Sequence, residues 1–264
     1  MRLSCQEQLL PGGSLAEKFE FALAAGWEAI ELRGQGGFAF RSRLPELKAA
    51  VRAGVVMPTV CVEMDHFIGD FDEARREDAI ANMADQLSVM AEIGGQGAMT
   101  PASWGMFSLR LPPFVPPRSP EQDRAVLTDA LGRLGEHARR EGVELYLEPL
   151  NRYEDHMVNR LADAVALIRE TGAAAVKVAA DTYHMNIEEA DPCAALREAA
   201  PFLGHVQVSD SNRLEPGAGH VPFAALFSVL REVGYAGQLA LESRLSGPAG
   251  EVLPRSAAFL RDCR

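Results

Sequence analysis

The 264-residue chain is poor in several features that mark particular classes of protein. It contains four cysteines, and none of them form a CxxC pair, which is typical of buried thiols in a reducing compartment rather than of a disulfide framework. No run approaches the roughly 18 apolar residues of a membrane-spanning helix, and the N-terminal MRLSCQEQLLPGG lacks the apolar core of a signal peptide. We therefore expect a cytoplasmic protein without a membrane partner.

Positive charge is also scarce. The chain has 26 Lys and Arg against 37 Asp and Glu, for a net charge of −11. Duplex DNA and anionic membranes require a positive footprint, so this balance argues against nucleic-acid and membrane partners. Apolar residues nevertheless make up 47% of the chain, which excludes disorder. Because α/β barrels of about this length form one unit, we expect a single domain over residues 1–264.

Short apolar runs alternate with segments of helical spacing along the whole chain. There are eight runs: Leu3–Cys5, Trp27–Leu32, Val55–Val62, Gln96–Thr100, Val143–Leu147, Ala175–Ala180, Leu203–Val208 and Gln238–Leu241. Apolar strands alternating with helices indicate a parallel sheet covered on both sides, and eight units predict a closed (β/α)8 TIM barrel. The doubly wound alternative is disfavoured because the turn at residues 6–13 has no GxGxxG pattern.

Polar residues mark the ends of four neighbouring strands in this plan. Glu148, Asp181, Gln207 and Glu242 are separated by 33, 26 and 35 residues, each about one βα unit, so all four should lie on one rim of the barrel. Three converging carboxylates repel one another unless a cation lies between them. Oxygen ligands without sulfur suit hard divalent ions. The pattern therefore predicts one divalent metal ion, Mn²⁺ first, with Mg²⁺ or Co²⁺ as alternatives.

Three longer strings carry a family resemblance. EPLNRYE at 148–154, DTYHMNIEE at 181–189 and SDSNR at 209–213 resemble the ketose 3-epimerases of the tagatose/psicose type, which belong to the xylose isomerase-like TIM barrels. The resemblance implies that the four rim residues hold the metal, and that Glu148 and Glu242 are also the catalytic acid–base pair. It further implies a homo-oligomer, dimer or tetramer, and a small-molecule sugar substrate.

The same resemblance assigns substrate-binding roles and shows one departure. Residues matching Glu154, His184 and Arg213 hold the sugar in the family. The epimerases have His where Gln207 stands, and HVQ followed by residues 216–219 (PGAG) is more similar to the hydroxypyruvate isomerase branch. Because Gln still offers an oxygen ligand, we expect metal binding to persist although the substrate does not transfer.

Further candidates surround the expected rim. His66 follows the third strand and is expected either to contact substrate or to be a loop histidine. Glu31 and Arg33 end the second strand, where a salt bridge competes with a substrate contact, and His205 is a candidate for supporting the ligands from behind. The Pro-rich stretch at 101–119 is expected to be a lid, a binding loop or a subunit contact.

The chemistry predicted for such a site is proton transfer next to a carbonyl, between two Glu residues, through a metal-stabilised enediolate. The leading hypothesis is an isomerase or 3-epimerase of a small keto sugar. The alternatives are hydroxypyruvate isomerase and a lyase of the same fold, either a keto-inositol dehydratase or an enzyme that cleaves C-glycosides by elimination from a 3-keto sugar. A three-zinc hydrolase is disfavoured by only six histidines, and a non-catalytic role by the complete ligand set.

Overall fold

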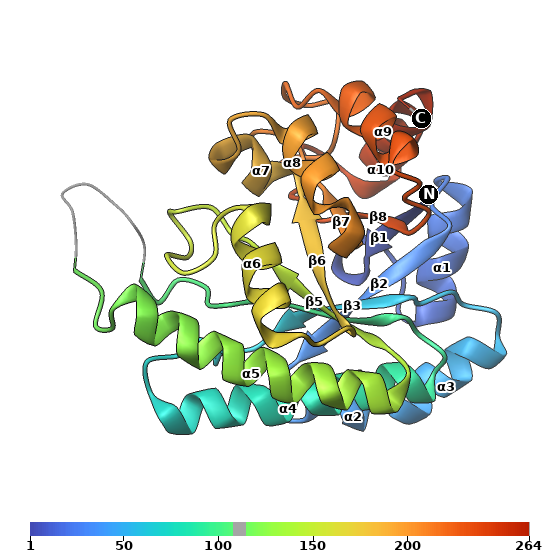
Figure 1. The fold of residues 1–264 in the computed structure, drawn as a ribbon. Coiled ribbons are helices and arrows are strands. Elements are labelled where there is room, and N and C mark those ends of the chain that lie inside the picture. Colours follow the sequence, from blue (N-terminus) through green and yellow to red (C-terminus); the bar gives the residue numbers. More distant parts are fainter. Residues whose placement is uncertain (108–114, 264) are drawn as a thin grey trace.

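Within residues 1–107 and 115–263, which the computed structural model describes, eight parallel strands form one closed barrel. Each strand pairs with its neighbour in sequence order, and β8 returns to pair with β1 (Figure 1). This arrangement confirms the predicted TIM barrel. The strands are β1 (Arg2–Gln6), β2 (Ala29–Gln35), β3 (Thr59–Glu63), β4 (Gly97–Pro101), β5 (Glu144–Glu148), β6 (Val176–Asp181), β7 (Leu203–Val208) and β8 (Gln238–Leu241).

Helices surround the barrel, and α4 and α5 run side by side along one flank (Figure 1). Among the described residues, two βα connections carry an additional helix, after β2 and after β6. The helices are α1 (Leu15–Ala24), α2 (Ala39–Ser42), α3 (Leu44–Arg52), α4 (Glu73–Glu92), α5 (Pro120–Glu141), α6 (Leu161–Thr171), α7 (Thr182–Glu188), α8 (Pro192–Ala199), α9 (Phe223–Glu232) and α10 (Ala249–Asp262), with 3₁₀ turns at Glu7–Leu9 and Ala200–Phe202. None of the helices in the described ranges is long and apolar enough to cross a membrane.

The starts of two strands differ from the sequence prediction by two residues or more. β3 begins at Thr59 rather than Val55. Pro58 precedes it and has no N–H to donate to a ladder, which accounts for the late start. β2 begins at Ala29 rather than Trp27. The Trp27 indole is buried against α10 instead, where Nε1 donates a hydrogen bond to the Leu253 carbonyl at 3.2 Å.

Two helices begin with a capping box, as their sequences predict. Ser14 caps α1 with a reciprocal bond from Glu17, and Ser119 caps α5 in the same way with Gln122. Leu15, Phe19 and Leu23 recur at every fourth residue, a spacing that predicts one apolar helix face, but Leu23 at the end of α1 is 53% exposed. The buried residues of α1 are Leu15 and Ala22, which are two turns apart and share one face.

Candidate active site

The four predicted ligands occupy the carboxyl ends of β5 to β8. Glu148 and Asp181 are the last residues of β5 and β6, and both are buried. Gln207 pairs in register with Asp181 across β6 and β7 and is fully buried. Glu242 directly follows β8, and its N–H donates to the Val208 carbonyl at 3.2 Å. The barrel therefore brings the four positions to one rim, as their spacing predicted.

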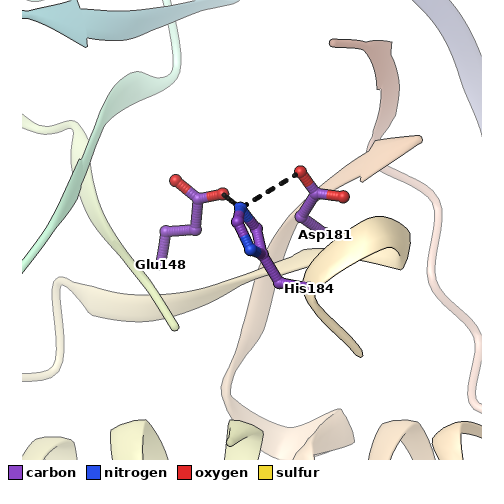
Figure 2. A group of neighbouring side chains, drawn as sticks. All are labelled: Glu148, Asp181 and His184. Atoms are coloured by element: carbon purple, nitrogen blue, oxygen red, sulfur yellow. Dashed lines mark ion pairs between the residues drawn. The ribbon is translucent and has the colours of Figure 1, made fainter. Parts of the chain in front are cut away.

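A compact cluster forms around Glu148 and Asp181. His184 on α7 lies between them, with Nε2 at 3.7 Å from Glu148 Oε1 and 3.8 Å from Asp181 Oδ2 (Figure 2). One ligand atom from each residue falls within 4.8 Å of the others, so the cluster can hold a metal ion. The position of His184 against the carboxylates was not predicted, because the sequence argument assigned it only to the sugar.

Unpartnered oxygen atoms provide a test of whether a divalent ion fits. Glu148 Oε1, Gln207 Oε1 and Glu242 Oε2 are buried and accept no hydrogen bond from the described part of the chain. Buried polar atoms are normally satisfied, since leaving one bare costs free energy. Oxygen donors of this kind suit a hard cation, so the chemistry of these residues fits a divalent metal.

The pKa values of Glu148 and Glu242 are both raised above the ordinary value of a glutamate. Burial, together with the charges of Glu242 and Asp181, raises the pKa of Glu148 well above its usual range. Burial and the charges of Asp181 and Glu31 raise the pKa of Glu242 to about 7, although Arg213 opposes them. Carboxyl groups whose pKa is raised by burial and by neighbouring charges are candidates for acid–base work.

Arg213 supplies positive charge to the same rim. Its guanidinium pairs with Asp181 Oδ2 and lies 3.1 Å from Glu242 Oε1, so it bridges two of the predicted ligands. The guanidinium also stacks over the Tyr183 ring, 4.8 Å from its centroid. Arg213 adopts φ 60°, a conformation that L-residues adopt rarely and that is often found at functional sites.

Asn151 is a site residue that the sequence argument missed, although it lies inside the EPLNRYE string. Its backbone N–H and its side-chain amide both face His184 Nδ1, at 3.0 and 2.8 Å. Two donors on Nδ1 leave that nitrogen as an acceptor, so the neutral ring carries its proton on Nε2. A ring in this state has no nitrogen free for a metal ion, which leaves Glu148 and Asp181 as the ligands that this cluster offers. Burial lowers the pKa of His184 to about 4, which favours this neutral form.

Glu154 lies beside this group at the mouth of the barrel. Its Oε1 accepts a hydrogen bond from the Asn151 amide at 2.8 Å, and its Oε2 accepts one from the Trp104 indole at 3.0 Å. Trp104 is 58% exposed and comes from the Pro-rich stretch at 101–119. Residues 108–114 of that stretch lie outside the described residues.

The remaining candidates are placed away from this cluster or behind it. His66 Nδ1 pairs with Asp78 Oδ2 of α4 at 2.7 Å. Of the two interpretations considered for Glu31 and Arg33, a salt bridge within the rim is present for Arg33, which pairs with Glu63, whereas Glu31 is buried inside the barrel. Depth along the strand explains this difference, because two residues of a strand span about 6.6 Å, so Arg33 reaches the mouth while Glu31 stays below it.

The sequence matches one protein family and is similar to enzymes of known activity. A family model described as Xylose isomerase-like TIM barrel matches residues 19–263. The chain is 40% identical over 266 residues to the 3-dehydro-D-guloside 4-epimerase of Escherichia coli (strain K12), with all of both chains covered. It is 33% identical over 228 residues to the L-ribulose 3-epimerase of Mesorhizobium japonicum, which covers 86% of this chain and 72% of that protein.

Solved structures of two epimerases are similar to this chain in fold. The crystal structure of the 3-keto-D-glucoside 4-epimerase YcjR from E. coli matches with a TM-score of 0.93 at 40% identity and covers 100% of both chains. A structure of L-ribulose 3-epimerase matches with a TM-score of 0.82 at 26% identity, covering 100% of this chain and 95% of that one.

Proposed function

Since the chain belongs to the xylose isomerase-like TIM barrel family, we propose that it is a metal-dependent sugar epimerase that inverts the carbon next to a carbonyl. The substrate we propose is a 3-keto sugar, with inversion at C4. Support for this choice comes from the 40% identity, over both full lengths, to a protein named as a 4-epimerase of a 3-dehydro-D-guloside.

A 4-epimerase of a 3-keto sugar and a 3-epimerase of a 2-ketose perform the same chemical operation. In both, the inverted carbon is next to the carbonyl, which makes its proton acidic enough to be removed and returned. The 3-epimerisation expected from the sequence therefore becomes a 4-epimerisation when the carbonyl is at C3 instead of C2. The proton-transfer machinery is unchanged, and only the position of the sugar on it differs.

Glu148 and Glu242 are the groups we propose for the two proton transfers. Glu148 ends β5 and Glu242 directly follows β8, so the two groups come from strands that are not neighbours in the barrel. One removes the proton from one face of the carbon, and the other returns a proton to the opposite face, which inverts the centre. The observation that carries the proposal is their pair of unpartnered oxygens, Glu148 Oε1 and Glu242 Oε2.

We propose that Glu148, Asp181, Gln207 and Glu242 hold the metal, with Mn²⁺ favoured over Mg²⁺ and Co²⁺. When bound, such an ion stabilises the negative charge that develops on the carbonyl oxygen as the proton leaves. Asp181 is kept in place by the Tyr183 N–H, which donates to Oδ1 at 2.7 Å.

Sugar binding is assigned to Glu154, His184 and Arg213. His184 Nε2 carries the ring proton and donates it to a substrate oxygen, because Asn151 occupies Nδ1. Glu154 accepts hydrogen bonds from sugar hydroxyls at the mouth, and Arg213 adds charged donors. His66 remains a candidate for a further contact, although its pairing with Asp78 holds Nδ1 away from a ligand.

A ketose 3-epimerase is the second candidate function, favoured by the 33% identity to an L-ribulose 3-epimerase. Purified protein with Mn²⁺ should be incubated separately with a 3-keto-D-glucoside, L-ribulose, D-psicose and hydroxypyruvate, and the products followed by proton NMR. We expect the C4 epimer from the 3-keto-glucoside at the highest rate. Turnover of L-ribulose alone would favour the second candidate, and an enone that absorbs in the ultraviolet would identify a lyase.

A further inference from the structure

A second carboxylate, Glu31 on β2, is buried in the barrel interior beneath the rim. Its side chain is 0% exposed, and side chains from three other strands surround it. Oε1 accepts hydrogen bonds from the amides of Gln207 at 2.9 Å and Gln6 at 3.2 Å. Oε2 accepts one from the Thr59 hydroxyl at 2.8 Å and lies 2.7 Å from His205 Nε2.

The hydrogen bonds at Glu31 all run in one direction. Gln207 and Gln6 present their amide Nε2 groups to Oε1, and Thr59 presents its hydroxyl to Oε2. The carboxylate oxygens of Glu31 are the acceptors, so each of these three side chains presents an N–H or an O–H to them.

For Gln207 this requirement decides which end of the amide faces which way. The two ends of a Gln side chain have nearly the same shape, so only hydrogen bonding distinguishes them. Because Glu31 accepts from Nε2, the oxygen must point away from Glu31. Gln207 Oε1 is the atom left buried and without a donor from the described residues, and it belongs to the residue paired with Asp181 across β6 and β7.

We propose that Glu31 is a positioning residue for the metal site: by holding the amide nitrogen of Gln207, it turns the Gln207 oxygen toward the cation. His205 supports Glu31 from the same strand as Gln207, two residues earlier, and the Tyr146 ring stacks on the His205 ring with centroids 5.4 Å apart. Glu31 thus contacts the ligand side chain and not the metal ion, as hydrogen-bonding partners of metal-binding side chains commonly do. This inference rests on the proposed function, because it presupposes that the rim binds a metal.

The test is the affinity for Mn²⁺, measured by isothermal titration calorimetry on the metal-free full chain. We expect Glu31→Gln to weaken Mn²⁺ binding on the order of 10–100-fold, because the substituted amide also offers an N–H and no longer dictates the Gln207 orientation. We expect Gln207→Ala to weaken it comparably. The double variant should bind no more weakly than Gln207→Ala, because Glu31 acts through Gln207.

A purely structural role for Glu31 predicts a different result. In that case the loss of Mn²⁺ affinity in the double variant equals the product of the fold-losses in the two single variants. That outcome, or an unchanged affinity in Glu31→Gln, would overturn the inference. Thr59→Val is the matched control, since it removes a donor to the other oxygen of Glu31 and should keep the wild-type affinity. Circular dichroism of the metal-free variants checks their fold.

A second variant covers the case in which Glu31→Gln does not fold. Glu31→Asp keeps the negative charge opposite His205 but withdraws the oxygens from Gln207, and it should also weaken Mn²⁺ binding. Unchanged affinity in Glu31→Asp would then overturn the inference. Failure of the proposed function is distinguishable, because in that case the wild-type protein itself binds no Mn²⁺.

Discussion

Glu148 and Glu242 are the residues on which turnover should depend most directly. Replacing either by Gln removes a proton-transfer group while keeping the size of the side chain. We expect Glu148→Gln and Glu242→Gln to lower kcat on the order of 10²–10⁴-fold, the usual contribution of a general acid or base. Steady-state rates with the 3-keto-glucoside check this.

The matched control is Glu63→Gln. Glu63 also ends a barrel strand, but it is exposed and pairs with Arg33. We expect this variant to keep the wild-type rate. An undiminished kcat in Glu148→Gln would contradict the acid–base assignment.

The raised pKa of Glu242 predicts how the stability of the metal-free protein changes with pH. Because the pKa is about 7 in the folded state and 4.5 is the ordinary value, the folded protein binds more protons than the unfolded one between these limits. Its free energy of unfolding therefore falls as pH rises from about 4.5 to 7. Since the side chain is partly exposed, we expect about 2 kcal/mol from this group.

Urea unfolding of wild-type protein and Glu242→Gln at pH 5 and pH 8, with EDTA present, measures the contribution of Glu242 together with the effect of its charge on the pKa of Glu148. The substituted amide does not ionise, so the variant should gain stability relative to the wild type as the pH rises. His184 titrates in both proteins and its effect cancels in the difference. A difference that is the same at both pH values would refute the assignment of the raised pKa to Glu242.

At the scale of whole elements, β4 and β5 approach so closely that only glycine fits at one position. A Cβ on Gly97 would lie 2.1 Å from the Glu144 carbonyl oxygen, and backbone cannot move aside cheaply. We expect Gly97→Ala to destabilise the barrel by several kcal/mol, near the upper end for single substitutions, because it separates β4 from the strand that carries Glu148.

Gly132 offers the control, because it lies inside α5 and a methyl group added there would have nothing within 4 Å among the described residues. Gly132→Ala should raise the free energy of unfolding by about 0.5–1 kcal/mol, since alanine restricts the unfolded chain. Chemical denaturation measures both variants. Equal stability of Gly97→Ala and wild type would show that the strands can separate without cost.

The elements also show what could be predicted from the sequence. Apolar runs and helical spacing predicted the eight βα units, and one unit of separation placed Glu148, Asp181 and Gln207 on neighbouring strands. Contacts between residues far apart in the sequence have no local sequence pattern that predicts them. The Glu31–Gln207 hydrogen bond joins residues 176 positions apart, and the Asn151–His184 contact depends on where two loops meet. Such contacts follow from side-chain orientation in the folded state, which spacing does not specify.

At the scale of the whole molecule, the metal should stabilise the fold. A ligand that binds only the native state adds about 2.7 kcal/mol when its concentration is 100 times Kd. For a chain of this size, that raises Tm by roughly 5–10 °C. Calorimetry of EDTA-treated protein, before and after addition of Mn²⁺, checks this.

Gln207→Ala serves as the control for this stabilisation, because it removes a proposed ligand and should show a smaller shift at the same Mn²⁺ concentration. A Tm that does not respond to Mn²⁺, Mg²⁺ or Co²⁺ would contradict the metal site. The expected dimer or tetramer and the cytoplasmic location remain predictions from the sequence.

Proton exchange at the carbon next to the carbonyl tests the central claim most directly. The Mn²⁺-loaded protein should be incubated with a 3-keto-D-glucoside in D₂O, and the sugar examined by NMR and mass spectrometry. We predict that deuterium replaces the proton at C4 as the C4 epimer appears, and that EDTA or Glu148→Gln abolishes both. An epimer formed without deuterium at C4, or no exchange with any keto sugar, would contradict proton transfer between Glu148 and Glu242.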